Sequence, residues 1–111
     1  VLKQGSFIDA DDFHKGSGAA TVYQVPDGQD VLRFEDFSVT NGPDLHVILS
    51  SNPNPTSSSD IGDDYIDLGS LKGNMGNQNY EIPADIDLAN YQSVVIYCMP
   101  FHVVFATATL N

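Results

Sequence analysis

Cysteine and tryptophan are almost missing from this chain. Its 111 residues include one cysteine, Cys98, and no tryptophan. A single cysteine cannot form an internal disulfide, so the paired-cysteine framework of many small secreted domains is excluded. The fold must therefore depend on a hydrophobic core. A chain of this length buries roughly 65% of the surface that its unfolded form exposes, which is enough for one stable domain.

Basic residues are also scarce. Four Lys and Arg residues stand against fifteen Asp and Glu residues, for a formal net charge of −11. Nucleic-acid binding depends on Lys and Arg side chains that neutralise phosphates, so we expect no nucleic-acid partner. The expected partners are cations, metal ions or basic patches on proteins. The alternative is that the charge only keeps the protein in solution.

Long apolar runs are absent too. No stretch approaches the ~20 apolar residues that a membrane-spanning helix needs, so we expect no membrane insertion. The hydrophobic fraction of 41% is ordinary for a globular chain, and residues 1–111 form one domain. The chain begins at Val1 rather than Met, which leads us to expect a mature form or an excised domain.

What the chain does contain is a series of short apolar runs separated by Gly, Pro, Asn and Asp. No window shows a sustained helical period, whereas many short strands at this spacing are typical of a sandwich or a barrel. We predict an antiparallel β-sandwich of about eight short strands, with a closed β-barrel as the alternative. The predicted strands cover residues 5–10, 19–25, 31–37, 45–50, 65–68, 80–83, 93–99 and 101–110.

The last two predicted strands differ from the others. Residues 45–50 alternate, with Leu45 on one face and His46 on the other, as in a half-buried strand. Residues 93–99 and 101–110 are apolar on both faces, so they should be central strands. Pro100 cannot donate to a strand ladder and should mark the turn between them. Cys98 and His102 should then lie near one end of the sheet.

One polar connection, residues 51–64, is unusually long. Such loops in compact domains are usually functional or mobile. Four aspartates lie on it or just after it: Asp60, Asp63, Asp64 and Asp67. Calcium prefers several oxygen ligands, so these carboxylates are a candidate calcium site, although their spacing is not that of an EF-hand. The alternative is that they are solvated loop charges.

Five segments in order carry a family resemblance. They are residues 5–7, 32–37, 42–47 (GPDLHV), 66–83 (IDLGSLKGNMGNQNYEIP) and 93–106 (SVVIYCMPFHVVFA). Together they resemble a DM-thirteen domain over nearly the whole chain. The resemblance implies an extracellular or cell-surface protein with a role in electron transfer. It also implies that Cys98 is the characteristic cysteine of the family, acting as a bare redox thiol or as a ligand for a group such as haem.

The residues themselves leave several interpretations of Cys98 open. A reactive thiol needs a lowered pKa, and no Lys or Arg is close in sequence, so Cys98 could equally be a small core residue. Copper would be held by Cys98, His102 and His46 in a blue-copper arrangement, with Met99, Met75 or a backbone oxygen as the axial ligand. Haem would need Cys98 together with His102, His46 or a methionine. His46 and His102 could also be ordinary strand and rim residues.

Two classes of function follow. The first is an extracellular redox-associated domain that works through Cys98 with a protein redox partner. The second is a binding, adhesive or self-assembling structural module with an inert cysteine, for which exposed edge strands would allow self-association. An enzyme with its own substrate is less well supported, since the chain has no Gly-x-Ser-x-Gly elbow and no glycine-rich phosphate loop before a helix.

Overall fold

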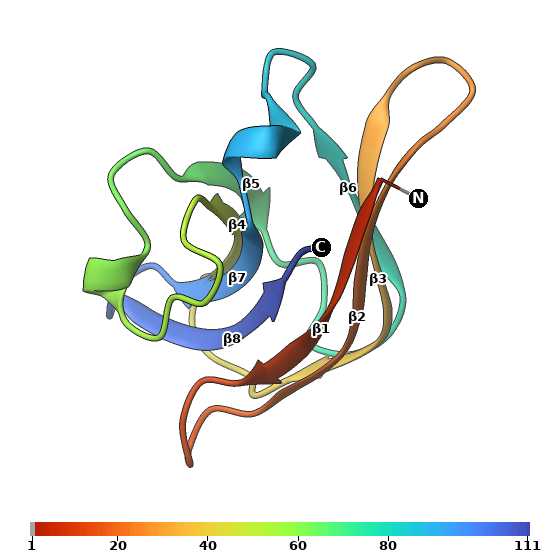
Figure 1. Cartoon of the computed structure of the whole chain (residues 1–111). Coiled ribbons are helices and arrows are strands. Elements are labelled where there is room, and N and C mark those ends of the chain that lie inside the picture. Colours follow the sequence, from red (N-terminus) through yellow and green to blue (C-terminus); the bar gives the residue numbers. More distant parts are fainter. Residues whose placement is uncertain (1) are drawn as a thin grey trace.

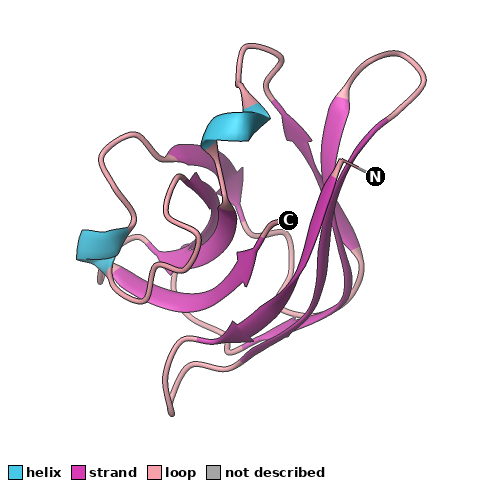
Figure 2. Ribbon diagram, in the orientation of Figure 1, coloured by secondary structure: helices cyan, strands magenta, loops and turns pink. Residues whose placement is uncertain are grey.

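The computed structural model describes residues 2–111, so the expectation that concerns Val1 lies outside the described residues. Residues 2–111 form eight strands and two short 3₁₀ helices (Figures 1 and 2). All eight predicted strands are present. The elements are β1 (Lys3–Asp9), β2 (Gly16–Gln24), β3 (Asp30–Val39), β4 (Leu45–Ser50), η1 (Ser58–Asp60), β5 (Ile66–Ser70), β6 (Gln78–Ile82), η2 (Leu88–Asn90), β7 (Ser93–Cys98) and β8 (Val103–Thr109).

The strands form one antiparallel sheet in the order β5-β4-β7-β8-β1-β2-β3-β6. Strand β1 joins two halves of this sheet: its first residues, from Lys3 to Ser6, pair with β2, and its last, from Phe7 to Asp9, pair with β8. The sheet curls until its two edge strands, β5 and β6, come into contact without a ladder between them (Figure 1). The result is a nearly closed barrel, and both the sandwich and the barrel prediction are compatible with it.

The curled sheet encloses the main core. Three phenylalanines lie at its centre, with ring centroids of Phe7 and Phe34 4.9 Å apart and those of Phe34 and Phe37 4.8 Å apart. Strands β7 and β8 are buried almost throughout, which confirms that they are central strands covered on both faces. The turn between them contains Pro100, as the sequence predicts.

The long connection after β4 explains how β7 and β8 are covered on the outer face. Its Pro55 is fully buried, and the carbonyl oxygen of Pro55 accepts a hydrogen bond from the Thr107 hydroxyl at 3.1 Å. The carbonyl oxygen of Asn52 accepts one from the Ser93 hydroxyl at 2.6 Å. Ile61 completes a second, smaller apolar cluster on this side of the sheet. The loop is therefore packed against the sheet as a cover.

Strand boundaries differ from the predicted ones where the backbone is irregular. Strand β2 begins at Gly16, three residues before the predicted start, because a bulge at Gly18 lets the pairing with β3 continue past it. Gly18 has a φ of 106°, a conformation that side-chain-bearing residues rarely adopt. Strand β8 begins at Val103, since Phe101 and His102 belong to the turn.

Candidate functional site

Cys98 is the last residue of β7, at the end of the sheet where that strand turns into β8. It lies opposite Leu45 of β4 and Val103 of β8. Alternation along the strand points its side chain into the main core, and only 1% of the residue is exposed. The structure thus decides the face of the sheet that the two-sided apolar pattern left open.

The connection between β3 and β4 covers the thiol. The Sγ of Cys98 donates a hydrogen bond to the carbonyl oxygen of Pro43 at 3.3 Å. Beside it, Gly42 lies so close to the ring of Phe105 that an added Cβ would fall 2.6 Å from a ring carbon. A side chain at this position would push the connection and the ring apart, so glycine is what allows the cover to close.

Unusual backbone conformations flank Cys98 on both sides. Asp44 directly precedes Leu45 and has a φ of 49°, and His102 directly precedes Val103 and has a φ of 55°. Among the described non-glycine residues only Asp36 shares this left-handed conformation. Asp, Asn and His adopt it at moderate cost, and such residues are concentrated at functional sites. A residue with left-handed backbone conformation therefore directly precedes each of the two strands that pair with Cys98.

His46 lies on the other face of β4 from the thiol. It pairs with Tyr97, whose side chain belongs to the outer cluster. Its Nδ1 is 2.9 Å from the Asp67 carboxylate, and its Nε2 is 3.0 Å from Asp44. The hydrogen bond to Asp67, assisted by Asp44 and opposed by partial burial, raises the pKa of His46. The ring can donate to both carboxylates only when it is protonated.

His102 also lies away from the thiol. Its Nδ1 is 3.2 Å from the hydroxyl of Tyr97, and burial raises the pKa of that hydroxyl. A copper site would need both histidines on the side of Cys98 with free ring nitrogens. His46 meets neither requirement, because its ring lies across the sheet with both nitrogens against carboxylates. The residues present do not fit the blue-copper arrangement.

Haem fits no better. An axial thiolate must be open to the porphyrin face, whereas the Cys98 sulfur is covered by the connection that contains Pro43. Met99 follows Cys98 in the turn and packs against the outer cluster, and Met75 is exposed in the connection between β5 and β6. The arrangement that remains for Cys98 is a free, buried thiol.

The four candidate calcium ligands are engaged separately. Asp60 accepts hydrogen bonds from the amide and hydroxyl of Thr56, which lower its pKa. Asp64 accepts one from the Ser51 hydroxyl at 3.4 Å, Asp67 binds His46, and Asp63 is exposed. Within residues 2–111 no three His, Cys, Asp or Glu side chains lie together in a way that could hold a metal ion.

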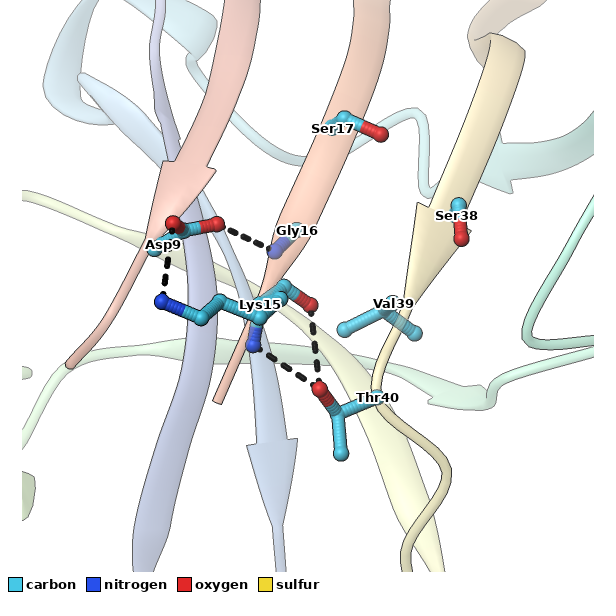
Figure 3. A pocket seen from close by; sticks show the side chains of 7 residues that line it. All are labelled: Asp9, Lys15, Gly16, Ser17, Ser38, Val39 and Thr40. Carbon is cyan, nitrogen blue, oxygen red and sulfur yellow. Dashed lines mark hydrogen bonds and ion pairs between the residues drawn. The ribbon is translucent and has the colours of Figure 1, made fainter. Parts of the chain in front are cut away.

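Polar residues that sequence reasoning missed lie close to the thiol's end of the sheet. Figure 3 shows a cleft where Lys15 forms an ion pair with Asp9 at 3.5 Å, and where the amide of Lys15 donates to the Thr40 hydroxyl at 2.8 Å. Next to Lys15, the ring of His14 packs against that of Phe105, with centroids 4.3 Å apart and the ring planes tilted by 45°. No sequence pattern marks the last two pairs, because Lys15 and Thr40 are 25 positions apart and His14 and Phe105 lie even farther apart in the chain. Asp44 and His46, by contrast, are only two positions apart, and Asp44 reaches the His46 ring from the turn directly before β4.

The family comparison covers nearly the whole chain. The model of the family described as electron transfer DM13 matches residues 6–110. No curated protein and no solved structure matches the chain. None of the described residues belongs to a helix that is long and apolar enough to cross a membrane.

Proposed function

This chain belongs to the DM13 electron-transfer family, and we propose that it is an extracellular redox domain whose working group is the Cys98 thiol. The observation that carries the proposal is the place of this thiol. It lies at the rim of the barrel, under one connection of the chain, and is hydrogen-bonded only to a neutral carbonyl oxygen. Opening that connection alone would expose the sulfur while the rest of the barrel stays folded.

The chemistry of a bare thiol suits a partner that carries a disulfide. The sulfur of Cys98 would attack one sulfur of the partner's disulfide, forming a mixed disulfide and breaking the partner's S–S bond. The departing sulfur of the partner leaves as a thiolate and takes up the proton that Cys98 loses. The partner is thereby reduced by one thiol, and Cys98 is oxidised. The domain exchanges electrons in this step and needs no substrate of its own.

A structural module is the second candidate, and the burial of Cys98 favours it. A cysteine with 1% exposure in an apolar core often acts only as a small hydrophobic residue. The edges of β5 and β6, which touch without a ladder between them, would then supply the surfaces for assembly if they separate, since edge strands offer unpaired backbone groups. In this case the thiol should never react while the barrel is folded.

Two measurements on the protein from its native source separate these functions. The first is a visible absorption spectrum, and the second is a titration of the thiol without denaturant, with Cys98→Ala as the control. A colourless protein whose thiol reacts while folded supports redox chemistry by the bare cysteine. A colourless protein whose thiol reacts only after unfolding would refute it in favour of the structural module. A haem or copper-thiolate band would show that Cys98 is a ligand, against the geometry described above.

A further inference from the structure

Four connections of the barrel meet at the end where Cys98 lies. In an antiparallel sheet alternate connections fall at the same end, and here they are residues 10–15, 40–44, 71–77 and 99–102. We call the surface that they form the thiol-end surface. Figure 1 shows these connections as the turns from β1 to β2, β3 to β4, β5 to β6 and β7 to β8.

Hydrogen bonds hold these connections together. Residues 40–44 are the centre, since the Thr40 amide donates to the Lys15 carbonyl oxygen at 2.9 Å and the Met99 amide donates to the Asp44 carbonyl oxygen at 3.3 Å. Directly before them, the Val39 amide donates to the Asn74 carbonyl oxygen at 2.9 Å. The hydrogen bond between Thr40 and Lys15 lies at the cleft of Figure 3, which both residues line. These hydrogen bonds place the four connections next to one another at this end of the barrel.

The most exposed apolar side chains belong to the thiol-end surface. The three most exposed large hydrophobic residues described are Phe13 (82%), Met75 (71%) and Phe101 (70%). Each belongs to a different connection of the thiol-end surface. Aromatic and methionine side chains are enriched in protein–protein interfaces, so three exposed ones at the same end of the barrel favour a protein-binding role for that end.

The net negative charge, in contrast, lies mostly outside the thiol-end surface. The four connections contain three of the fifteen acidic residues and two of the four basic ones, for a formal charge of −1 out of the total of −11. The remaining residues, which we call the acidic body, carry −10. The thiol-end surface is therefore much less negative per residue than the rest of the chain, and most of the acidic residues, which a basic partner would complement, lie outside it.

We propose that the thiol-end surface docks a basic redox protein, the disulfide-bearing partner of the proposed function. That partner would present an apolar patch, to contact Phe13, Met75 and Phe101, bordered by Lys and Arg that face the acidic body. The charge of −11 attracts such a partner over long range and repels a second copy of this chain. This inference rests on the proposed function, since docking here places the partner directly over the connection that covers Cys98.

The test uses the ¹⁵N-labelled domain and ferricytochrome c, a basic redox protein without a disulfide, so that docking is measured without thiol exchange. We expect amide resonances of the four connections to shift on titration, and the shifts to be lost with lysine-acetylated cytochrome c. The double variant Phe13→Ser/Phe101→Ser should weaken binding by at least about tenfold, which is the loss expected if only one of the two side chains is an interface anchor. Ile8→Ser is the matched control, because Ile8 is 52% exposed on β1 outside the four connections, and it should change binding less than about twofold.

Three results would overturn the inference. They are an absence of shifts, shifts that map to the acidic body instead of the four connections, and binding that survives lysine acetylation. Shifts in the same connections that grow with the concentration of the domain alone would show that a second copy occupies the surface. Docking is read here from resonance shifts and not from electron flow. An inert Cys98 would therefore refute the proposed function while leaving the docking result intact.

Discussion

The connection that covers Cys98 should open locally, and the rate of thiol modification should report it. The perturbation is the addition of an aromatic disulfide reagent, dithiobis-nitrobenzoate, to the folded protein. A buried thiol reacts only while the structure around it is open. When opening and closing are fast compared with the reaction, the factor by which the folded protein reacts more slowly than the unfolded chain gives the free energy of opening. The reaction is followed by the absorbance of the released thiolate.

The contacts of the connection set the expected magnitude. Opening breaks the backbone hydrogen bond between Met99 and Asp44, at about 1 kcal/mol. It also uncovers part of the Phe105 ring, which lies against Gly42. Since full burial of a Phe side chain contributes about 1.5–3 kcal/mol, we assign about 2 kcal/mol to this contact. The hydrogen bond from the thiol to Pro43 is weak and adds little. The sum of about 3 kcal/mol predicts a slowing of roughly a hundredfold.

Urea provides the control and the refutation. Local opening exposes little surface, so the rate of modification should depend only weakly on urea below the unfolding transition. If the slowing instead matches the full unfolding free energy, about 5 kcal/mol or more and thus several thousandfold, opening is global and the connection is no separate cover. If the folded and unfolded proteins react equally fast, Cys98 is not covered at all. Either result would refute the reasoning from the contacts of Gly42 and Pro43.

Three further predictions concern neighbouring parts of the structure. Gly42→Ala should destabilise the protein by about 1–3 kcal/mol in urea unfolding and speed thiol modification, because the added methyl group overlaps the Phe105 ring. His46→Gln should remove a pH-dependent contribution to stability. Because the pKa of His46 is raised in the folded state, this contribution is fully present below about pH 6.5 and is lost as the pH rises through the folded pKa. Melting temperatures of both proteins from pH 5 to 9 measure it. Thr107→Val should cost about 1–3 kcal/mol in urea unfolding, because it leaves the buried carbonyl oxygen of Pro55 without its donor.

Each of these has a result that would contradict it. An unchanged rate of thiol modification in Gly42→Ala would contradict the first prediction. A faster rate counts as support only if the circular dichroism spectrum shows that the variant is still folded. Identical differences between wild type and His46→Gln at pH 5 and pH 9 would show that protonation of the ring does not contribute. An unchanged stability in Thr107→Val would mean that the long connection after β4 is not held by this contact.

Strand positions could be read from the sequence because their cause is local. Alternating or continuous apolar runs between Gly, Pro and Asn turns predict strands whatever their neighbours are, and all eight are present. The same local pattern placed Cys98 and Pro100 at a strand end and a turn. Boundaries were less accurate, since the bulge at Gly18 and the turn at His102 depend on the pairing of strands.

Other properties were decided by tertiary contacts. The polar loop after β4 gave a pattern typical of a mobile segment, but hydrogen bonds to Ser93 and Thr107 make it a cover for the sheet. The copper hypothesis joined Cys98 to His46, and the two are close in strand register, since Cys98 pairs with Leu45, the residue before His46. Their side chains nevertheless lie on opposite faces of the sheet, because adjacent residues of a strand alternate.

The sequence by itself determined the all-β class, the number of strands, the family and the place of Cys98 at the end of a central strand, because these follow from local periodicity and from motif spacing. Only the tertiary structure decided which face carries the thiol, what covers it and which exposed residues surround it. Those properties depend on contacts between residues far apart in the chain, such as Cys98 with Pro43 and His14 with Phe105, and no local pattern encodes them.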